Sequence, residues 1–303
     1  MSITVNSQFT GIDMDGDYVF RAFRVDLKKA VQNISFVAAC LVTALLCFTA
    51  EVYTDFSNAR SYSVYEAILT LDKDTLLSDI SFSSVFVFGK SLSGYISMFL
   101  PVSSAFPYIT NLCSERNSGN IRFSIMRTGR LKYYFSKFGS ALLSGGFSTL
   151  LGVVMYGSIV FMLFPDINAY AVTAEDMLFF FPNGIVTFIA KTLIHSFLYG
   201  CISVMPAFFL SSFCRNPYIA LCVPFMVTYI CTTALNKIAS NEAVSGNFDA
   251  AANLQPFYPN SISNLLDLSD GRLYITLAFN LIFVVILLTS YIAIMEKRFD
   301  TGC

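Results

Sequence analysis

Long apolar stretches alternate with polar segments along the whole chain. A helix that crosses a bilayer needs about 20 predominantly apolar residues. Six stretches meet this length and predict transmembrane helices at residues 31–52, 91–112, 138–164, 184–213, 217–235 and 273–295. We therefore expect an all-α integral membrane protein, with a cytoplasmic segment at 1–30 and a transmembrane domain at 31–303.

The third apolar stretch is rich in small residues. They are Gly139, Ser140, Ala141, Ser144, Gly145, Gly146, Ser148 and Gly152. Small side chains let two helix backbones approach closely within a membrane. We expect this face to pack on another helix of the same chain, with a dimer seam as the alternative.

The positive charges lie on alternate sides of the expected spans. Thirteen lysines and arginines fall in the N-terminal segment, the links after the second and fourth spans, and the C-terminal tail, against five in the other three loops. Acidic residues show the opposite bias. Since positively charged loops stay in the cytoplasm, both termini are predicted to be cytoplasmic.

Composition agrees with this interpretation. The chain is 55% hydrophobic and 13% charged, whereas a soluble domain carries about 25% charge. Its net charge of -1 gives no reason to expect a nucleic-acid partner. None of its eight cysteines forms a C-x-x-C pair, so we expect neither a metal site nor a disulfide framework. We also expect no cleavable signal peptide, because the first apolar stretch begins late and is long enough to span.

The link at residues 114–137 contains a short amphipathic pattern. Gly119 and Gly129 lie at its two ends. Between them the apolar residues Ile121, Ile125 and Met126 are interleaved with Arg122 and Arg127. This pattern predicts a short helix at the cytoplasmic surface. On physical grounds alone, the helix is either an interaction element or an ordinary basic loop resting on lipid headgroups.

The same link resembles that of type-2 ABC permeases, the exporter class that includes drug, lantibiotic and polysaccharide permeases. The matching positions are Glu115, Gly119, residues 120–126, the Arg127-Thr128-Gly129-Arg130 turn and Lys137. The layout is similar too, with an interfacial helix at 18–29 and short outer helices at 237–272 before the sixth span. The first outer loop, 53–90, is longer than in many members, which leaves the subfamily open.

The resemblance implies that this link is a coupling helix that docks on a separate ATPase. Ile121, Ile125 and Met126 would share one face, and Arg122 would lie on another. The coupling residues would be Glu115, Gly119, Ile121, Arg122, Ile125, Met126 and Arg127. The expected partners are two ABC ATPase copies, a second permease and membrane lipid, in a plasma-membrane exporter of a peptide, drug-like or lipid-like substrate.

The sequence itself carries no ATPase motif, so the chain is not expected to be an enzyme. A Walker A loop reads G-x-x-x-x-G-K-[ST] and wraps phosphate with backbone amides. Gly89-Lys90-Ser91 matches its end, but Ser84 stands at the first glycine position. We expect no cofactor in this chain and expect ATP and Mg to bind the partner ATPase.

Three residues of the fourth span, Lys191, His195 and Tyr199, lie four positions apart and share one helix face. An ionisable group within a span suggests a function, so they are candidates to line a translocation path. Alternatively, Lys191 snorkels to water and His195 is a neutral group bonded to a neighbouring helix. Glu51 is expected to be an ordinary interfacial carboxylate unless it pairs with Lys191.

Other function classes remain open at this point. A secondary transporter would show inverted repeats and more charge at the midplane, and no convincing repeat is visible. An intramembrane metalloenzyme would need several His, Asp or Glu ligands inside the spans, and the chain has one histidine. A membrane sensor or scaffold that transports nothing would fit the same pattern.

Overall fold

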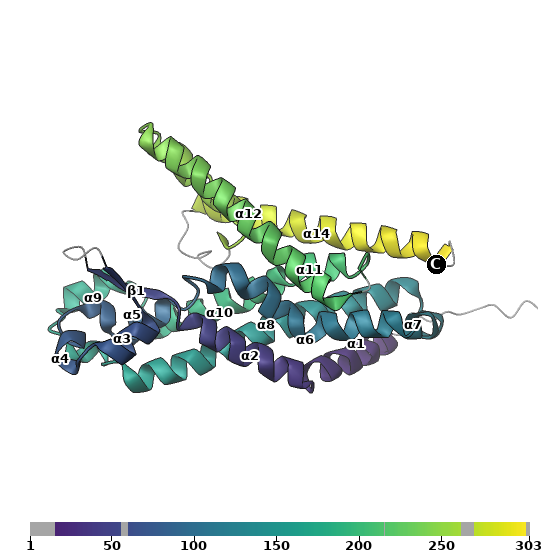
Figure 1. Ribbon diagram of the computed structural model, residues 1–303, viewed down its shortest axis with the longest axis horizontal. Coiled ribbons are helices and arrows are strands. Elements are labelled where there is room, and N and C mark those ends of the chain that lie inside the picture. Colours follow the sequence, from purple (N-terminus) through teal and green to yellow (C-terminus); the bar gives the residue numbers. More distant parts are fainter. Residues whose placement is uncertain (1–15, 56–59, 215, 262–269, 301–303) are drawn as a thin grey trace, which may run out of the picture.

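The computed structural model describes residues 16–55, 60–214, 216–261 and 270–300, which are mostly helical (Figure 1). The longer helices are α1 (Gly16–Val31), α2 (Ile34–Cys47), α6 (Ile96–Asn117), α7 (Asn120–Thr128), α8 (Arg130–Leu163), α10 (Ile185–Ser203), α12 (Pro217–Val244) and α14 (Asp270–Asp300). Short helices are α3 (Val64–Thr70), α4 (Lys73–Leu76), α5 (Ser84–Gly89), α9 (Ala174–Phe180), α11 (Met205–Leu210) and α13 (Phe248–Asn253). The 3-10 helices among the described residues are η1 (Ile80–Phe82), η2 (Ile167–Ala169) and η3 (Gln255–Phe257).

A sharp bend separates α1 from α2. The two helices meet at 60°, and Asn33 caps α2 by accepting a hydrogen bond from the Ser35 amide at 3.3 Å. The cap satisfies a backbone donor that would otherwise be orphaned at the helix start. The bend lies at residues 32–33, close to the boundary expected between the N-terminal segment and the first apolar stretch.

The central helix α8 packs against α2, α6 and α10 (Figure 1). A Cβ placed on Gly152 would lie 2.6 Å from Thr43 Cβ on α2. On α10, a Cβ on Gly200 would lie 2.7 Å from the carbonyl oxygen of Gly145 on α8. The prediction that the small residues of the third stretch pack within the chain is therefore confirmed.

The segment at 53–90 folds into a cap rather than an open loop. It begins with an antiparallel hairpin of β1 (Glu51–Asp55) and β2 (Arg60–Ser63), which the sequence pattern did not predict. Tyr156 on α8 donates to the Val87 carbonyl at 3.0 Å, and Tyr170 donates to the Leu76 carbonyl at 2.8 Å. Burial, helped by the Asp79 carboxylate, raises the pKa of Tyr170 to about 12, so its hydroxyl remains a donor at neutral pH.

The helices α12 and α14 lie on one side of the central bundle, and α12 extends away from it (Figure 1). Only 17% and 11% of the residues in their most apolar stretches are buried. Such apolar surfaces are expected to face lipid or another protein.

Four described helical segments are long and apolar enough to cross a membrane: Arg130–Ala169, Glu175–Leu210, Pro217–Val244 and Gly271–Lys297. The bent pair of α1 and α2 adds a fifth if it is counted as one span. Helix α6 is not among them, since serines and two prolines lower its hydropathy. Membrane-length apolar helices are thus confirmed, and the sixth span stays a prediction.

Several boundaries differ from the predicted ones. The first span is shorter, because α2 ends at Cys47 and the chain enters the hairpin. The fourth breaks at Val204 into α10 and α11, whereas α8 and α12 extend beyond their apolar stretches. Hydropathy locates the buried or lipid-facing part of a helix, whereas the backbone hydrogen bonds continue into polar residues.

Candidate functional site

The helix α7 is a separate nine-residue element between the long helices α6 and α8. Gly119 before it has φ 72° and Gly129 after it has φ 84°, a region that residues with a Cβ rarely adopt. Nothing lies within 4 Å of a Cβ built on either glycine. The sharp turns, and not close packing, therefore require glycine, and the predicted short helix is confirmed.

One side of α7 is buried and the other is exposed. Ile121 and Ile125 are 6% and 7% exposed and belong to the hydrophobic core shared with α6 and α8. Phe123 and Met126 are 73% and 76% exposed. The prediction that Met126 shares the face of the two isoleucines is wrong, because successive helical residues are turned by about 100°. The side chains of Arg122 and Arg127 lie outside the described part of the chain.

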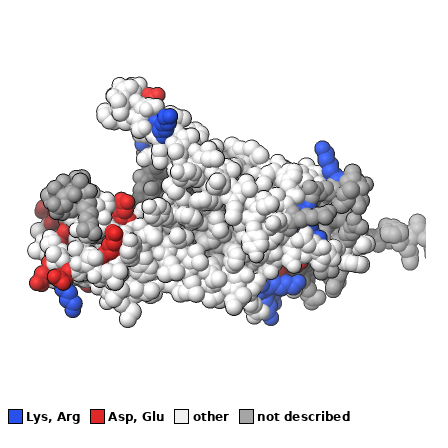
Figure 2. Space-filling view, in the orientation of Figure 1, with Lys and Arg blue, Asp and Glu red and all other residues white. Residues whose placement is uncertain are grey.

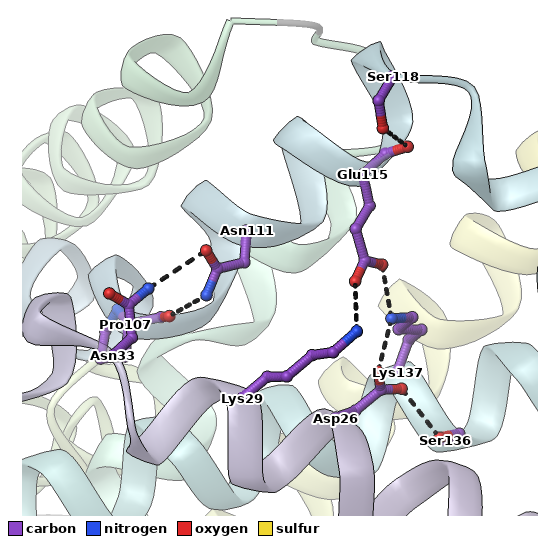
Figure 3. A network of polar contacts seen from close by, with 9 residues as sticks. All are labelled: Asp26, Lys29, Asn33, Pro107, Asn111, Glu115, Ser118, Ser136 and Lys137. Atoms are coloured by element: carbon purple, nitrogen blue, oxygen red, sulfur yellow. Dashed lines mark hydrogen bonds and ion pairs between the residues drawn. The ribbon is translucent and has the colours of Figure 1, made fainter.

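An ion-pair network joins three helices beside α7 (Figure 3). The Lys137 ammonium on α8 lies 2.7 Å from Glu115 Oε2 on α6 and 2.9 Å from Asp26 Oδ1 on α1. Ser136 also donates to Asp26 Oδ2 at 3.2 Å. Glu115 and Lys137, two separate positions of the resemblance to type-2 ABC permeases, thus belong to one cluster.

Burial makes this network costly to break. The Lys137 side chain is 5% exposed, against 13% for Asp26 and 28% for Glu115. A buried charge is tolerated only when it is paired. Lys29, 3.9 Å from Glu115 Oε1, brings the formal charge of the four groups to zero. The Tyr133 ring, with its centroid 5.3 Å from the Lys137 ammonium, adds a cation–π contact.

Asp26 is the member of the network that the sequence did not indicate. It stands in the basic run that contains Arg24, Lys28 and Lys29, where a single acid looks like an ordinary surface charge. Its partner Lys137 is 111 residues away. The usable signal was its spacing of three residues from Lys29, which places both groups on one face of α1.

Further polar bonds fasten the same region. Arg116 donates to the backbone carbonyl of Ser211, which ties the end of α6 to the turn after α11. Asn33 at the α1–α2 bend donates to Asn111 Oδ1 at 3.2 Å (Figure 3). The ends of α1, α2, α6, α8 and α11 near α7 are therefore held as one block.

Comparison with known proteins gives no relative. No protein-family model matches the sequence, and no curated protein matches it.

The structure places the other predicted site residues within the helix packing. Tyr199 is 2% exposed and donates to the Ser97 carbonyl at 2.5 Å, so its hydroxyl connects α10 to α6. His195 is 5% exposed, and Lys191 is half-buried. Both Glu51 and Lys191 are described, and no ion pair joins them. Of the three candidates, Tyr199 thus uses its hydroxyl in a hydrogen bond between two helices.

The described residues contain no group of three His, Cys, Asp or Glu side chains that could hold a metal ion. The seven cysteines in the same ranges are all free thiols. What the site can do is mechanical. Because one ammonium holds both carboxylates, the network ties α6, α8 and α1 together next to α7.

Proposed function

We propose that this chain is the permease subunit of an ABC exporter, energised by a separate ATPase subunit. The observation that carries the proposal is α7, a short helix set between two long ones. Its glycine turns define it, its isoleucines anchor it to the core, and Phe123 and Met126 protrude from it. Exposed aromatic and methionine side chains are typical anchors of protein interfaces.

The proposed membrane arrangement has six spans, formed by α2, α6, α8, α10 with α11, α12, and α14. On the face drawn in Figure 2, lysines and arginines gather mainly toward the end that contains α1 and α7, and acidic side chains mainly toward the end that contains the hairpin, with some basic side chains also at the hairpin end and near the tip of α12. Largely uncharged surface separates the two ends. This supports a plasma-membrane protein with α7 and both termini in the cytoplasm.

The proposed assembly contains two permeases and two ATPases. The poorly buried helices α12 and α14 offer apolar surface for a second permease, identical or similar. ATP and Mg would bind the ATPase pair, whose closure would push on α7. The network would pass that movement to α1 and α8, and so to the path taken by a peptide, drug-like or lipid-like substrate.

The test is recovery of an ATPase from the native cell. The full chain carries an affinity tag at its own chromosomal locus, and the complex is purified in mild detergent and assayed for Mg-dependent ATP hydrolysis. We expect an ATPase subunit to co-purify with the unmodified chain. Phe123→Asp and Met126→Asp should each lower its recovery roughly tenfold or more, because loss of an interface anchor costs about 2 kcal/mol or more.

Phe248→Asp is the matched control, because Phe248 on α13 is 70% exposed and lies far along the chain from α7. Its ATPase recovery should equal that of the unmodified chain. Absence of any ATPase from the unmodified complex would contradict the proposed function. Equal recovery with all three variants would instead contradict the docking role of α7.

A further inference from the structure

A pocket of about 460 Å³ opens beside the bend between α1 and α2. Its polar walls come from α1, the bend, α6 and α8, and they include Lys29, Gln32, Asn33, Tyr108, Asn111 and Glu115. Ligand pockets in proteins commonly measure about 300–1,000 Å³. The space is therefore large enough for a small polar group.

Tyr108 on α6 gives the pocket an unsatisfied donor. The residue is 4% exposed, and its hydroxyl has no hydrogen-bond partner among the described residues. Leaving a buried polar group unpaired costs about 1–3 kcal/mol, and most such groups find a partner. An acceptor supplied by a ligand would remove this cost.

The other polar groups of the pocket also favour a ligand rich in acceptors. The carboxylates of Asp26 and Glu115 already accept hydrogen bonds from Lys137. Lys29, by contrast, has a side chain that is 65% exposed, and its ammonium is 3.9 Å from Glu115, beyond hydrogen-bond length. The Lys29 ammonium and the Tyr108 hydroxyl are thus donors available to a ligand, and a phosphate oxygen suits both.

The formal charge of the pocket restricts which phosphate-containing groups it would bind. The two carboxylates cancel the ammonium groups of Lys29 and Lys137, so the pocket is formally neutral. A multiply charged anion would meet no net attraction. A zwitterionic ligand would be attracted. Lys29 can turn to bind the phosphate of the ligand, and Glu115 Oε1 is then free to accept a hydrogen bond from the ammonium of the ligand.

An apolar stripe runs along α2 from the edge of the pocket. Its members are Ile34, Val37, Leu41 and Leu45, which are 83%, 55%, 46% and 68% exposed. Spacings of three and four residues place them on one face of the helix. The stripe is about 16 Å long at 1.5 Å per residue, close to one leaflet of a hydrocarbon core about 30 Å thick.

We propose that this pocket binds the headgroup of a phosphoethanolamine lipid, with one acyl chain lying along α2. The phosphate accepts from Lys29 and Tyr108, and the primary ammonium donates to Glu115. This lipid site does not depend on the transport function, because it needs only the membrane position of α2. Since Glu115 belongs to both, lipid occupancy is linked to the ion-pair network beside α7.

Photo-crosslinking of the purified full chain tests the proposal. The chain is reconstituted in phosphatidylcholine vesicles that contain a phosphatidylethanolamine probe with a diazirine acyl chain. Unlabelled phosphatidylethanolamine should compete with the probe better than phosphatidylglycerol or additional phosphatidylcholine. Tyr108→Phe and Lys29→Ala should each weaken binding roughly tenfold, in line with a hydrogen bond to a charged group.

Two matched controls separate binding from folding. Tyr133→Phe removes another buried hydroxyl without a partner, one that does not line the pocket, and it keeps the ring beside Lys137. Lys28→Ala removes the exposed lysine next to Lys29. Both should crosslink like the unmodified chain.

The outcomes that overturn the proposal are distinct. If Tyr108→Phe crosslinks as strongly as the unmodified chain, or if Tyr133→Phe lowers crosslinking as much as Tyr108→Phe does, the lipid does not bind at the assigned site. If phosphatidylglycerol competes with the probe better than phosphatidylethanolamine does, the site does not select a zwitterionic headgroup. If soluble phosphoethanolamine competes as well as the lipid, the headgroup comes from water and the membrane part of the proposal fails. None of these readings involves an ATPase, so they leave the proposed function untouched.

Discussion

At the scale of single residues, Lys137 organises the site. Its ammonium lies within 3 Å of carboxylates on two other helices, and its side chain is 5% exposed. Removing one member of a buried ion pair leaves the charge of the other member buried without a partner, whereas removing all the charges together is often tolerated. The network can therefore be tested for stability and for coupling separately.

Lys137→Met should destabilise the protein by about 3–5 kcal/mol, because it strands both Asp26 and Glu115. Asp26→Asn should cost less, since Lys137 keeps Glu115 as its partner. The measurement is the temperature at which half of the protein leaves the monodisperse peak in detergent size-exclusion chromatography. Lys28→Met, at an exposed position, is the control and should leave that temperature unchanged.

The triple variant Asp26→Asn, Glu115→Gln, Lys137→Met should recover most of the stability lost by Lys137→Met alone. The complex of this variant with its ATPase subunit should nevertheless hydrolyse ATP without transport coupling, because the charged link between α1 and α8 is gone. A triple variant no more stable than Lys137→Met would show that the charges are not the cause of the loss.

At the scale of elements, α7 depends on two glycine turns. Gly129 has φ 84° and ψ 149°, a region occupied almost only by glycine, whereas Gly119 has φ 72° and ψ 2° and is left-handed helical. Asparagine tolerates the left-handed region, and alanine tolerates neither. The glycines thus determine the direction of α7 relative to α6 and α8, while the isoleucines determine which side of α7 is buried.

Gly129→Ala should destabilise the protein by about 1–3 kcal/mol and Gly119→Ala by about 1–2 kcal/mol, with Gly119→Asn milder still. Thermal stability of the detergent-solubilised protein measures this order. Gly184→Ala is the matched control, because Gly184 has φ 83° and ψ 157° and open space around it. It should lose as much stability as Gly129→Ala and yet retain ATPase recovery; equal loss of recovery would contradict a specific role for α7.

At the scale of the whole molecule, the helices differ in how deeply they are packed. The helix α8 is surrounded by α2, α6 and α10, whereas α12 and α14 remain largely uncovered (Figure 1). The cap and α7 lie toward opposite ends of the long axis (Figure 1). A membrane across the middle would separate the two ends.

Labelling of introduced cysteines with an impermeant maleimide tests this arrangement. In a background lacking Cys214, Cys222, Cys231 and Cys303, Asp74→Cys and Asn247→Cys should react in intact cells, and Ser118→Cys should react only after lysis. All three positions are exposed, so access to the reagent depends on the side of the membrane. Labelling of Ser118→Cys in intact cells would reverse the orientation.

The sequence by itself determined the features that arise from local chemistry. Apolar stretches of sufficient length predicted membrane helices, and Gly119 and Gly129 predicted the ends of α7. Small residues predicted the close packing of α8. Helix formation, turn conformation and lipid solubility depend on neighbouring residues, so they are legible in a linear pattern.

Only the tertiary structure decided which distant groups meet. Asp26 joins Lys137 across 111 positions, and packing against α6 and α8 buries Ile121 and Ile125 while Met126 stays exposed. Periodicity defines the faces of a helix, but the docking of other helices determines which face is covered and which charges are paired.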